Sequence, residues 1–248
     1  DQPFSTQDLL SPGDRFASTV SNCLRNKNVP IYLALPGGAY QIRRVPLEVA
    51  EEVDRRSQVA WEVTQTLSAK NGDYSINYVV RGSSAIWVAV PTSCVDGLTS
   101  AFLDCGVTLA GVCAGSIAMA QTLRRKHPSG RVTGILAEPG WISTVELQDR
   151  ALISATTQSP AAHTESDVAP VDAWSALLQK SIGKAPDRDR TYLVGEQTLL
   201  KDFLKTTDAR NHPDLLYPSG VDETSTGADT LTSVAYGAAL FGMGEEPL

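Results

Sequence analysis

An α/β fold is predicted by the order of the apolar segments along this chain. From residue 29 to residue 106, short runs rich in β-branched and aromatic residues alternate with segments in which apolar residues recur every three or four positions. Turns containing glycine or proline separate them. This region therefore has the order β-β-α-β-β-α, which predicts a compact unit that packs its helices on one face of a small sheet.

The first half of the chain supplies these elements in turn. Strands are expected over residues 29–35, 40–45, 74–81, 85–90 and 107–112. The first two flank Pro36-Gly37-Gly38 and are expected to form a hairpin. Helices are expected within residues 1–28, over 46–67, which begins with proline and early carboxylates, and over 92–105, which Gly106 ends.

The second half begins after Arg124 to Gly130, a basic segment that resembles a turn. Three strands with tight turns between them predict a β-meander over residues 132–137, 141–147 and 151–155. A polar loop is expected over residues 158–172. Further elements are expected as helices around 174–182, 198–205 and 229–243 and a strand over 191–194.

Composition excludes several function classes. The 248 residues carry a net charge of -7 without any long basic run, so nucleic acid is not expected as a partner. No apolar stretch approaches the roughly 20 residues that a membrane span needs. The four cysteines lack metal-site or CxxC spacing, and we expect them to be buried free thiols.

Other candidate groups have simpler interpretations. His127, His163 and His212 lie in turn-like segments without recognisable partner spacing and are expected to be exposed. Glu51, Glu52 and Asp54 could be paired carboxylates, but on a helix they form a solvated face. The sequence contains no intact catalytic motif of a common enzyme class.

Several segments, in this order, resemble the PilM family of type IV pilus assembly proteins, which belongs to the actin-like ATPase superfamily. Arg43 to Leu47 leads into an acidic helix at Glu48 to Glu62, as in that family. Trp87 to Pro91 and then Val95 to Gly106 resemble the strand and helix that leave subdomain 1C. Ser233 to Ala239 is similar to the small-residue helix near the end of actin-like folds.

This resemblance implies an actin-like (ribonuclease H-like), two-lobed α/β fold with an inserted β-β-α-β-β-α subdomain of the 1C type, and with the first strands of the fold missing from this sequence. The subdomains it implies are 1A-like for residues 1–28 and 107–128, 1C-like for 29–106, 2A/2B-like for 129–232, and a C-terminal helix returning to the first lobe for 233–248.

The resemblance also implies where a nucleotide would bind. Actin-like ATPases hold phosphates with two Asp-x-Gly hairpins, and the second one matches Glu138-Pro139-Gly140, where Glu replaces Asp and Pro removes one N–H donor. The family's glycine-rich adenosine loop matches Gly195. We expect Glu138, Gly140 and Gly195 to be a degenerate site or ordinary turns, so no cofactor is expected, and ATP and Mg²⁺ would bind only if the site is retained.

Three functions follow from the resemblance. The first is a cytoplasmic scaffold, recruited to the inner membrane by the cytoplasmic tail of a PilN-like pilus or secretion protein, with Arg43 and Arg44 as candidate partner-binding residues. Self-association is left open. The second is an active ATPase whose N-terminal phosphate loop is missing from the sequence. The third is a relative of FtsA or of the GspL cytoplasmic domain, which the absence of a membrane-targeting segment after Leu248 disfavours.

Overall fold

The computed structural model describes residues 30–48, 52–67, 72–159, 170–183, 185, 190–195, 200, 203, 213–215 and 232–242. The chain divides into two compact units, Asp1–Cys113 and Ala114–Leu248. Both are α/β, as the order of segments predicts. No helix in the described ranges is long and apolar enough to cross a membrane.

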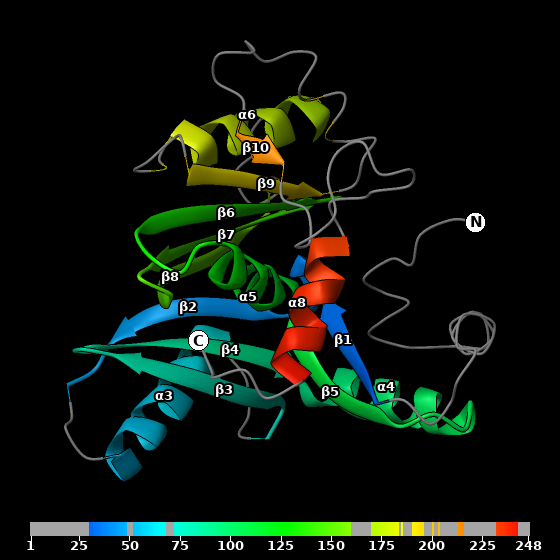
Figure 1. Cartoon of the computed structure of the whole chain (residues 1–248). Helices are drawn as coiled ribbons and strands as arrows, with labels where there is room; N and C mark the ends of the chain where they lie inside the picture. The colour runs from blue at the N-terminus through cyan, green and yellow to red at the C-terminus, as the bar shows by residue number, and fades with distance from the viewer. Residues whose placement is uncertain are drawn as a thin grey trace. The chain divides into compact units, whose positions relative to one another are not determined.

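The first unit contains two small sheets. Its elements are β1 (Ile31–Leu35), the 3-10 turn η1 (Gly37–Ala39), β2 (Gln41–Pro46), α3 (Glu52–Leu67), β3 (Tyr74–Arg81), β4 (Ser84–Pro91), α4 (Thr92–Asp104) and β5 (Leu109–Ala114). Strands β2, β4 and β3 form an antiparallel sheet in that order, whereas β1 pairs with β5 (Figure 1).

The predicted hairpin of β1 and β2 is wrong. Between them the chain forms the turn η1, in which the Ala39 N–H donates to the Pro36 carbonyl at 2.9 Å, and Tyr40 follows in extended conformation, 1% exposed. This buried turn carries β2 into another sheet, where it pairs with β4. The prediction relied on the closeness of the two strands in the sequence, but each pairs with a more distant strand, β1 with β5 and β2 with β4. The sheet that was expected to have four strands therefore has three.

Helix α3 packs on one face of the β2–β4–β3 sheet. Val59 and Val63, four residues apart on the helix, are 0% and 1% exposed and share a core with Trp87 and Val45 of the sheet. The described part of the helix starts at Glu52, later than the predicted Pro46, which ends β2 instead. Glu52 is exposed, as the prediction of a solvated acidic face requires.

Helix α4 confirms the predicted helix and its end. Its apolar side chains Leu98 and Phe102, four residues apart, are 0% and 3% exposed. Gly106 follows the helix with φ +69°, a left-handed conformation that glycine adopts without a Cβ penalty. The expectation of buried free thiols holds for Cys94, Cys105 and Cys113, while Cys23 lies outside the described residues.

The second unit is built on a five-stranded sheet. Its elements are α5 (Gly115–Lys126), β6 (Arg131–Glu138), β7 (Trp141–Gln148), β8 (Ala151–Gln158), α6 (Pro170–Gly183), β9 (Thr191–Gly195), β10 (Asp214–Leu215) and α8 (Thr232–Gly242). The strand order is β10-β9-β6-β7-β8. The predicted meander β6–β7–β8 is confirmed, and β9 joins it parallel to β6.

The two faces of this sheet are covered by different helices (Figure 1). On β6, Gly134 lies against Met119 and Leu123 of α5. Its neighbour Ile135 points to the opposite face and joins a core with Leu178 of α6. Because successive side chains of a strand alternate between faces, α5 and α6 must lie on opposite sides of the sheet. Helix α8 packs against α5.

Helix α5 corrects another expectation. Arg124 to Lys126 were predicted to belong to a turn, but they form the last turn of α5, where basic side chains interact favourably with the helix dipole. The helix is stabilised by tertiary packing, since Ala118 and Met119 on it are completely buried. The loop predicted over 158–172 ends earlier, because α6 begins at Pro170.

Two predicted helices fall largely outside the described residues. None of residues 1–28 is described, and of residues 198–205 only Leu200 and Phe203 are, both helical and buried. The described helix α8 confirms the central part of the helix predicted over 229–243.

Candidate functional site

The segment predicted to match a phosphate-binding hairpin is the turn between β6 and β7. Glu138 ends β6 and pairs with Trp141, the first residue of β7, so Pro139 and Gly140 form a two-residue turn. Gly140 has φ +77°, the left-handed conformation that glycine adopts at the second central position of a turn whose first central residue is proline. Proline carries no backbone N–H, so the turn itself offers only the Gly140 N–H to an anion.

Gly195 lies beside this turn. It ends β9, which runs parallel to β6, and it pairs with Ala137, the residue before Glu138. A Cβ at position 195 would overlap the Ala137 carbonyl oxygen, so a glycine is needed for this close approach of two strands. The structure therefore brings Glu138, Gly140 and Gly195 together at the carboxyl ends of β6 and β9, an edge of α/β sheets where ligands often bind.

Trp174 of α6 supports this turn and was not expected at the site. Its indole Nε1–H donates to the Glu138 carbonyl oxygen at 3.2 Å, and its ring packs edge-on against Phe203 with centroids 6.2 Å apart. Trp174 is 7% exposed. Its position in an amphipathic helix indicated only a core residue, because a contact with a turn 36 residues away leaves no local signal.

The chemistry available at this edge is limited. Glu138 is a half-buried carboxylate that could orient a hydrated cation, but within the described ranges no group of three or more His, Cys, Asp or Glu side chains could hold a metal ion directly. The Pro139 position lacks a donor, and the Glu138 carbonyl already accepts the Trp174 indole. The edge therefore offers a phosphate few groups: a two-residue turn with one proline and one half-buried carboxylate.

Arg43 and Arg44 lie on β2, in the first unit. Both are exposed, and their cross-strand neighbours on β4 are Trp87 and Ile86. Because strand side chains alternate, the two guanidinium groups project from opposite faces of the sheet. The Arg44 Nε–H donates to the Ser84 hydroxyl at 2.9 Å, which holds that side chain against the sheet. Adjacent arginines in the sequence are thus separated in space.

Among the described strands, β2 pairs only with β4 and so forms an edge of its sheet. An edge strand presents backbone N–H and C=O groups to any extended segment that approaches it. Pro46 at its end lacks an N–H, which shortens the usable edge to the residues before it. The two arginines therefore flank, one on each face, a strand that can accept another strand.

A basic and aromatic cluster lies where α5 ends. The His127 and Tyr192 rings lie 4.9 Å apart between centroids, and the Lys126 ammonium lies 4.8 Å from the Tyr192 centroid. Burial lowers the pKa of His127, and the charges of Lys126 and Arg190 lower it further. Burial, with a smaller contribution from Asp214, raises the pKa of Tyr192. The prediction that His127 is exposed is therefore wrong, while His163 and His212 lie outside the described residues.

Comparisons with known proteins identify the fold. No protein-family model and no curated protein sequence matches the chain. Among solved structures, a chain of the PilM-PilN type IV pilus biogenesis complex is similar with a TM-score of 0.61 and 13% identity, over 91% of this chain and 84% of that one. The cytoplasmic domain of EpsL, an inner-membrane component of the type II secretion system of Vibrio cholerae, is similar with a TM-score of 0.55 and 9% identity, over 93% of this chain and 82% of that one.

At these identities the comparisons establish the fold alone. The chain shares the α/β fold of these two structures, which is the fold that the resemblance of its sequence segments to the PilM family implies.

Proposed function

We propose that this chain is a cytoplasmic scaffold of a type IV pilus or related secretion machinery, which binds the cytoplasmic tail of an inner-membrane partner and is recruited to the membrane by it. The observation that carries the proposal is the shared fold over 91% of the chain with a chain of the PilM-PilN complex. The EpsL cytoplasmic domain, itself from an inner-membrane component, supports the same setting.

The β2 edge is the surface that we assign to this tail. An extended peptide added beyond β2 would gain main-chain hydrogen bonds and would point successive side chains to alternate faces of the sheet. Two consecutive residues of the peptide would then lie beside Arg43 on one face and Arg44 on the other. The proposal therefore requires a tail with acidic residues at two consecutive positions, bound more weakly as salt screens the charges.

The experiment is a titration of the purified chain into a fluorescein-labelled peptide, which is the cytoplasmic tail of the bitopic membrane protein encoded beside this chain. Arg43→Glu should weaken binding about tenfold, since it replaces an attraction with a repulsion worth roughly 1 kcal/mol or more in sum. Arg56→Glu is the matched control, because Arg56 is exposed on α3 of the same unit. No saturable anisotropy change at high micromolar concentrations of the chain would refute the proposal, as would equal losses in both variants.

The nucleotide site is proposed to be degenerate. The alternative, an active ATPase, draws support from the pairing of Gly195 with Ala137, the residue before Glu138, at the turn that contains Gly140. The missing N–H of Pro139 and the occupied Glu138 carbonyl favour the degenerate site. Isothermal calorimetry with Mg·ATP tests the degenerate site, which should give no saturable heat. A stoichiometric binding isotherm that Gly140→Val abolishes would instead establish a working nucleotide site, and release of inorganic phosphate from ATP would then establish the ATPase.

A further inference from the structure

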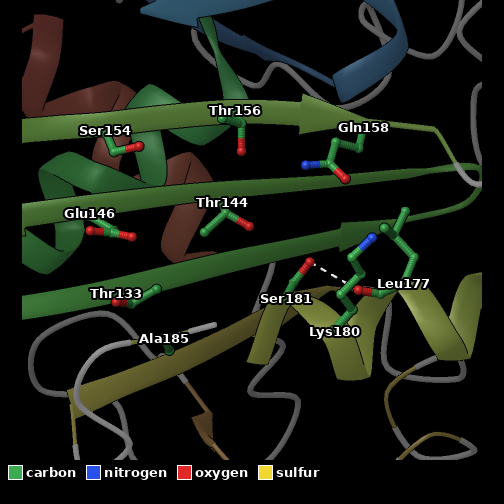
Figure 2. A pocket seen from close by; sticks show the side chains of 10 residues that line it. All are labelled: Thr133, Thr144, Glu146, Ser154, Thr156, Gln158, Leu177, Lys180, Ser181 and Ala185. Atoms are coloured by element: carbon green, nitrogen blue, oxygen red, sulfur yellow. Dashed lines mark hydrogen bonds between the residues drawn. The ribbon is translucent and has the colours of Figure 1, made fainter. Parts of the chain in front are cut away.

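A polar pocket lies on the α6 side of the five-stranded sheet, entirely within the second unit. Its volume is about 200 Å³, and β6, β7, β8 and α6 all contribute to its lining (Figure 2). Six lining side chains end in a hydroxyl or an amide: Thr133, Thr144, Ser154, Thr156, Gln158 and Ser181. We call this the α6-side pocket. It lies apart from the turn that contains Glu138 and Gly140, neither of which lines it.

The register of the strands explains why a pocket forms here. Along β6, Ile135 belongs to the apolar core that α6 covers, and its partner on β7 is Thr144, which in turn pairs with Thr156 on β8. This row of side chains across the sheet therefore begins with the apolar Ile135 beneath α6 and continues with the polar Thr144 and Thr156. A sheet face beneath a helix is normally apolar across its width, and this departure leaves a trough of hydroxyls beside α6 (Figure 2).

Thr133 indicates that the α6-side pocket is more than a solvated sheet surface. It is 1% exposed, it lines the pocket, and its Oγ1 has no hydrogen-bond partner. A buried hydroxyl without a partner costs free energy, and folded proteins rarely retain one without a reason. A ligand hydroxyl placed in the pocket would give Thr133 the partner that the protein does not.

Two charged side chains line the pocket, Glu146 and Lys180. The Glu146 carboxylate is paired with Arg131 at 2.6 Å between Oε2 and Nη2. Lys180 lies in the last turn of α6, where the negative end of the helix dipole favours a cation. The Ser181 hydroxyl donates to the Leu177 carbonyl at 3.0 Å and keeps its lone pairs to accept (Figure 2). Beside the exposed Lys180 ammonium, the pocket offers a ligand the neutral hydroxyl and amide groups of its other polar side chains.

From this chemistry we propose that the α6-side pocket binds a neutral, polyhydroxylated small molecule of monosaccharide size. Hydroxyls that both donate and accept match Ser, Thr and Gln side chains, and Leu177 supplies an apolar contact for the carbon skeleton. The volume holds about seven waters at roughly 30 Å³ each, below the roughly 300 Å³ at which drug-sized sites begin. Thr133 is the residue at which the ligand would be recognised most strongly.

The test is a ¹⁵N–¹H NMR titration of the full chain with D-glucose, myo-inositol and sorbitol, with gluconate and glucosamine as charged counterparts. We expect saturable shifts at the amides of Thr133, Thr144 and Thr156, with a millimolar Kd for at least one neutral probe. Thr133→Val should weaken that binding about three- to tenfold, the loss of one hydrogen bond. Thr157→Val, on the opposite face of β8, should leave the Kd unchanged.

Three results would overturn the proposal: only linear, unsaturable shifts with all neutral probes; the same Kd in wild type and in Thr133→Val; or tighter binding of gluconate or glucosamine than of the neutral probes. Should Thr133→Val disturb the spectrum as a whole, Ser154→Ala removes a hydroxyl from the half-buried rim, and a Kd unchanged in that variant would equally count against the site.

Discussion

The packing of α8 against α5 can be tested at a single glycine. A Cβ added at Gly237 would overlap the Ala118 carbonyl oxygen and lie 2.5 Å from its carbon and 2.9 Å from Thr122 Oγ1. Backbone atoms cannot rotate away, so Gly237→Ala should cost close to the upper end of the roughly 1–3 kcal/mol typical of overpacking. Alanine recovers about 1 kcal/mol of helix propensity, which leaves a net destabilisation of about 2 kcal/mol.

The matched control is Gly183→Ala, at the last residue of α6, where an added Cβ meets nothing within 4 Å. Urea denaturation followed by circular dichroism should give a lower midpoint with an unchanged slope for Gly237→Ala. The melting temperature should fall by about 4–8 °C in a chain of this size. The reasoning is refuted if the two variants agree within about 0.5 kcal/mol, because α5 and α8 would then not approach at this position.

Three further outcomes are expected. Burial lowers the pKa of His127 beside Tyr192, so its contribution to stability is complete above the ordinary value of 6.5 and is lost as the pH falls towards the folded-state pKa. Urea midpoints measured between pH 7.5 and 5 should therefore fall more steeply for wild type than for His127→Phe, and parallel curves would contradict this. Burial raises the pKa of Cys113 to about 12, so its thiolate fraction at pH 8 is on the order of 10⁻⁴. Iodoacetamide should modify it only in the unfolded chain, as peptide mass spectrometry would show, and rapid labelling of the native protein would show the thiol to be accessible. Trp174→Phe removes the hydrogen bond to the Glu138 carbonyl and should lower the unfolding free energy by about 1–2 kcal/mol, whereas an unchanged urea midpoint would mean that the bond does not support the turn.

The candidate site was only partly predictable from the sequence. Glu138 and Gly140 form the predicted turn, because a Glu-Pro-Gly segment between two apolar runs is a local signal. Gly195 was predicted to be a turn directly after a strand, but it ends β9, and its contact with Ala137 depends on the parallel pairing of β9 with β6, which no local pattern encodes. Trp174 was missed as a member of the site for the same reason.

Local order in the amino-acid sequence determined most of the secondary structure and the class of the fold. Strands β3, β4 and β6 to β9, and helices α4 and α6, follow from the periodicity of apolar residues and from turn residues, which act over a few positions. The net charge of -7 without a basic run, and the spacing of the cysteines, are the grounds on which neither a nucleic-acid partner nor a cysteine metal site is expected.

Only the tertiary structure decided which strands pair and which polar groups meet. It separated β1 from β2, turned Arg43 and Arg44 to opposite faces, and left the Thr133 hydroxyl buried without a partner in the α6-side pocket. The physical reason is that pairing and burial depend on contacts between residues far apart in the chain. Hydrophobic periodicity states which side of an element is buried, but it does not identify the element that buries it.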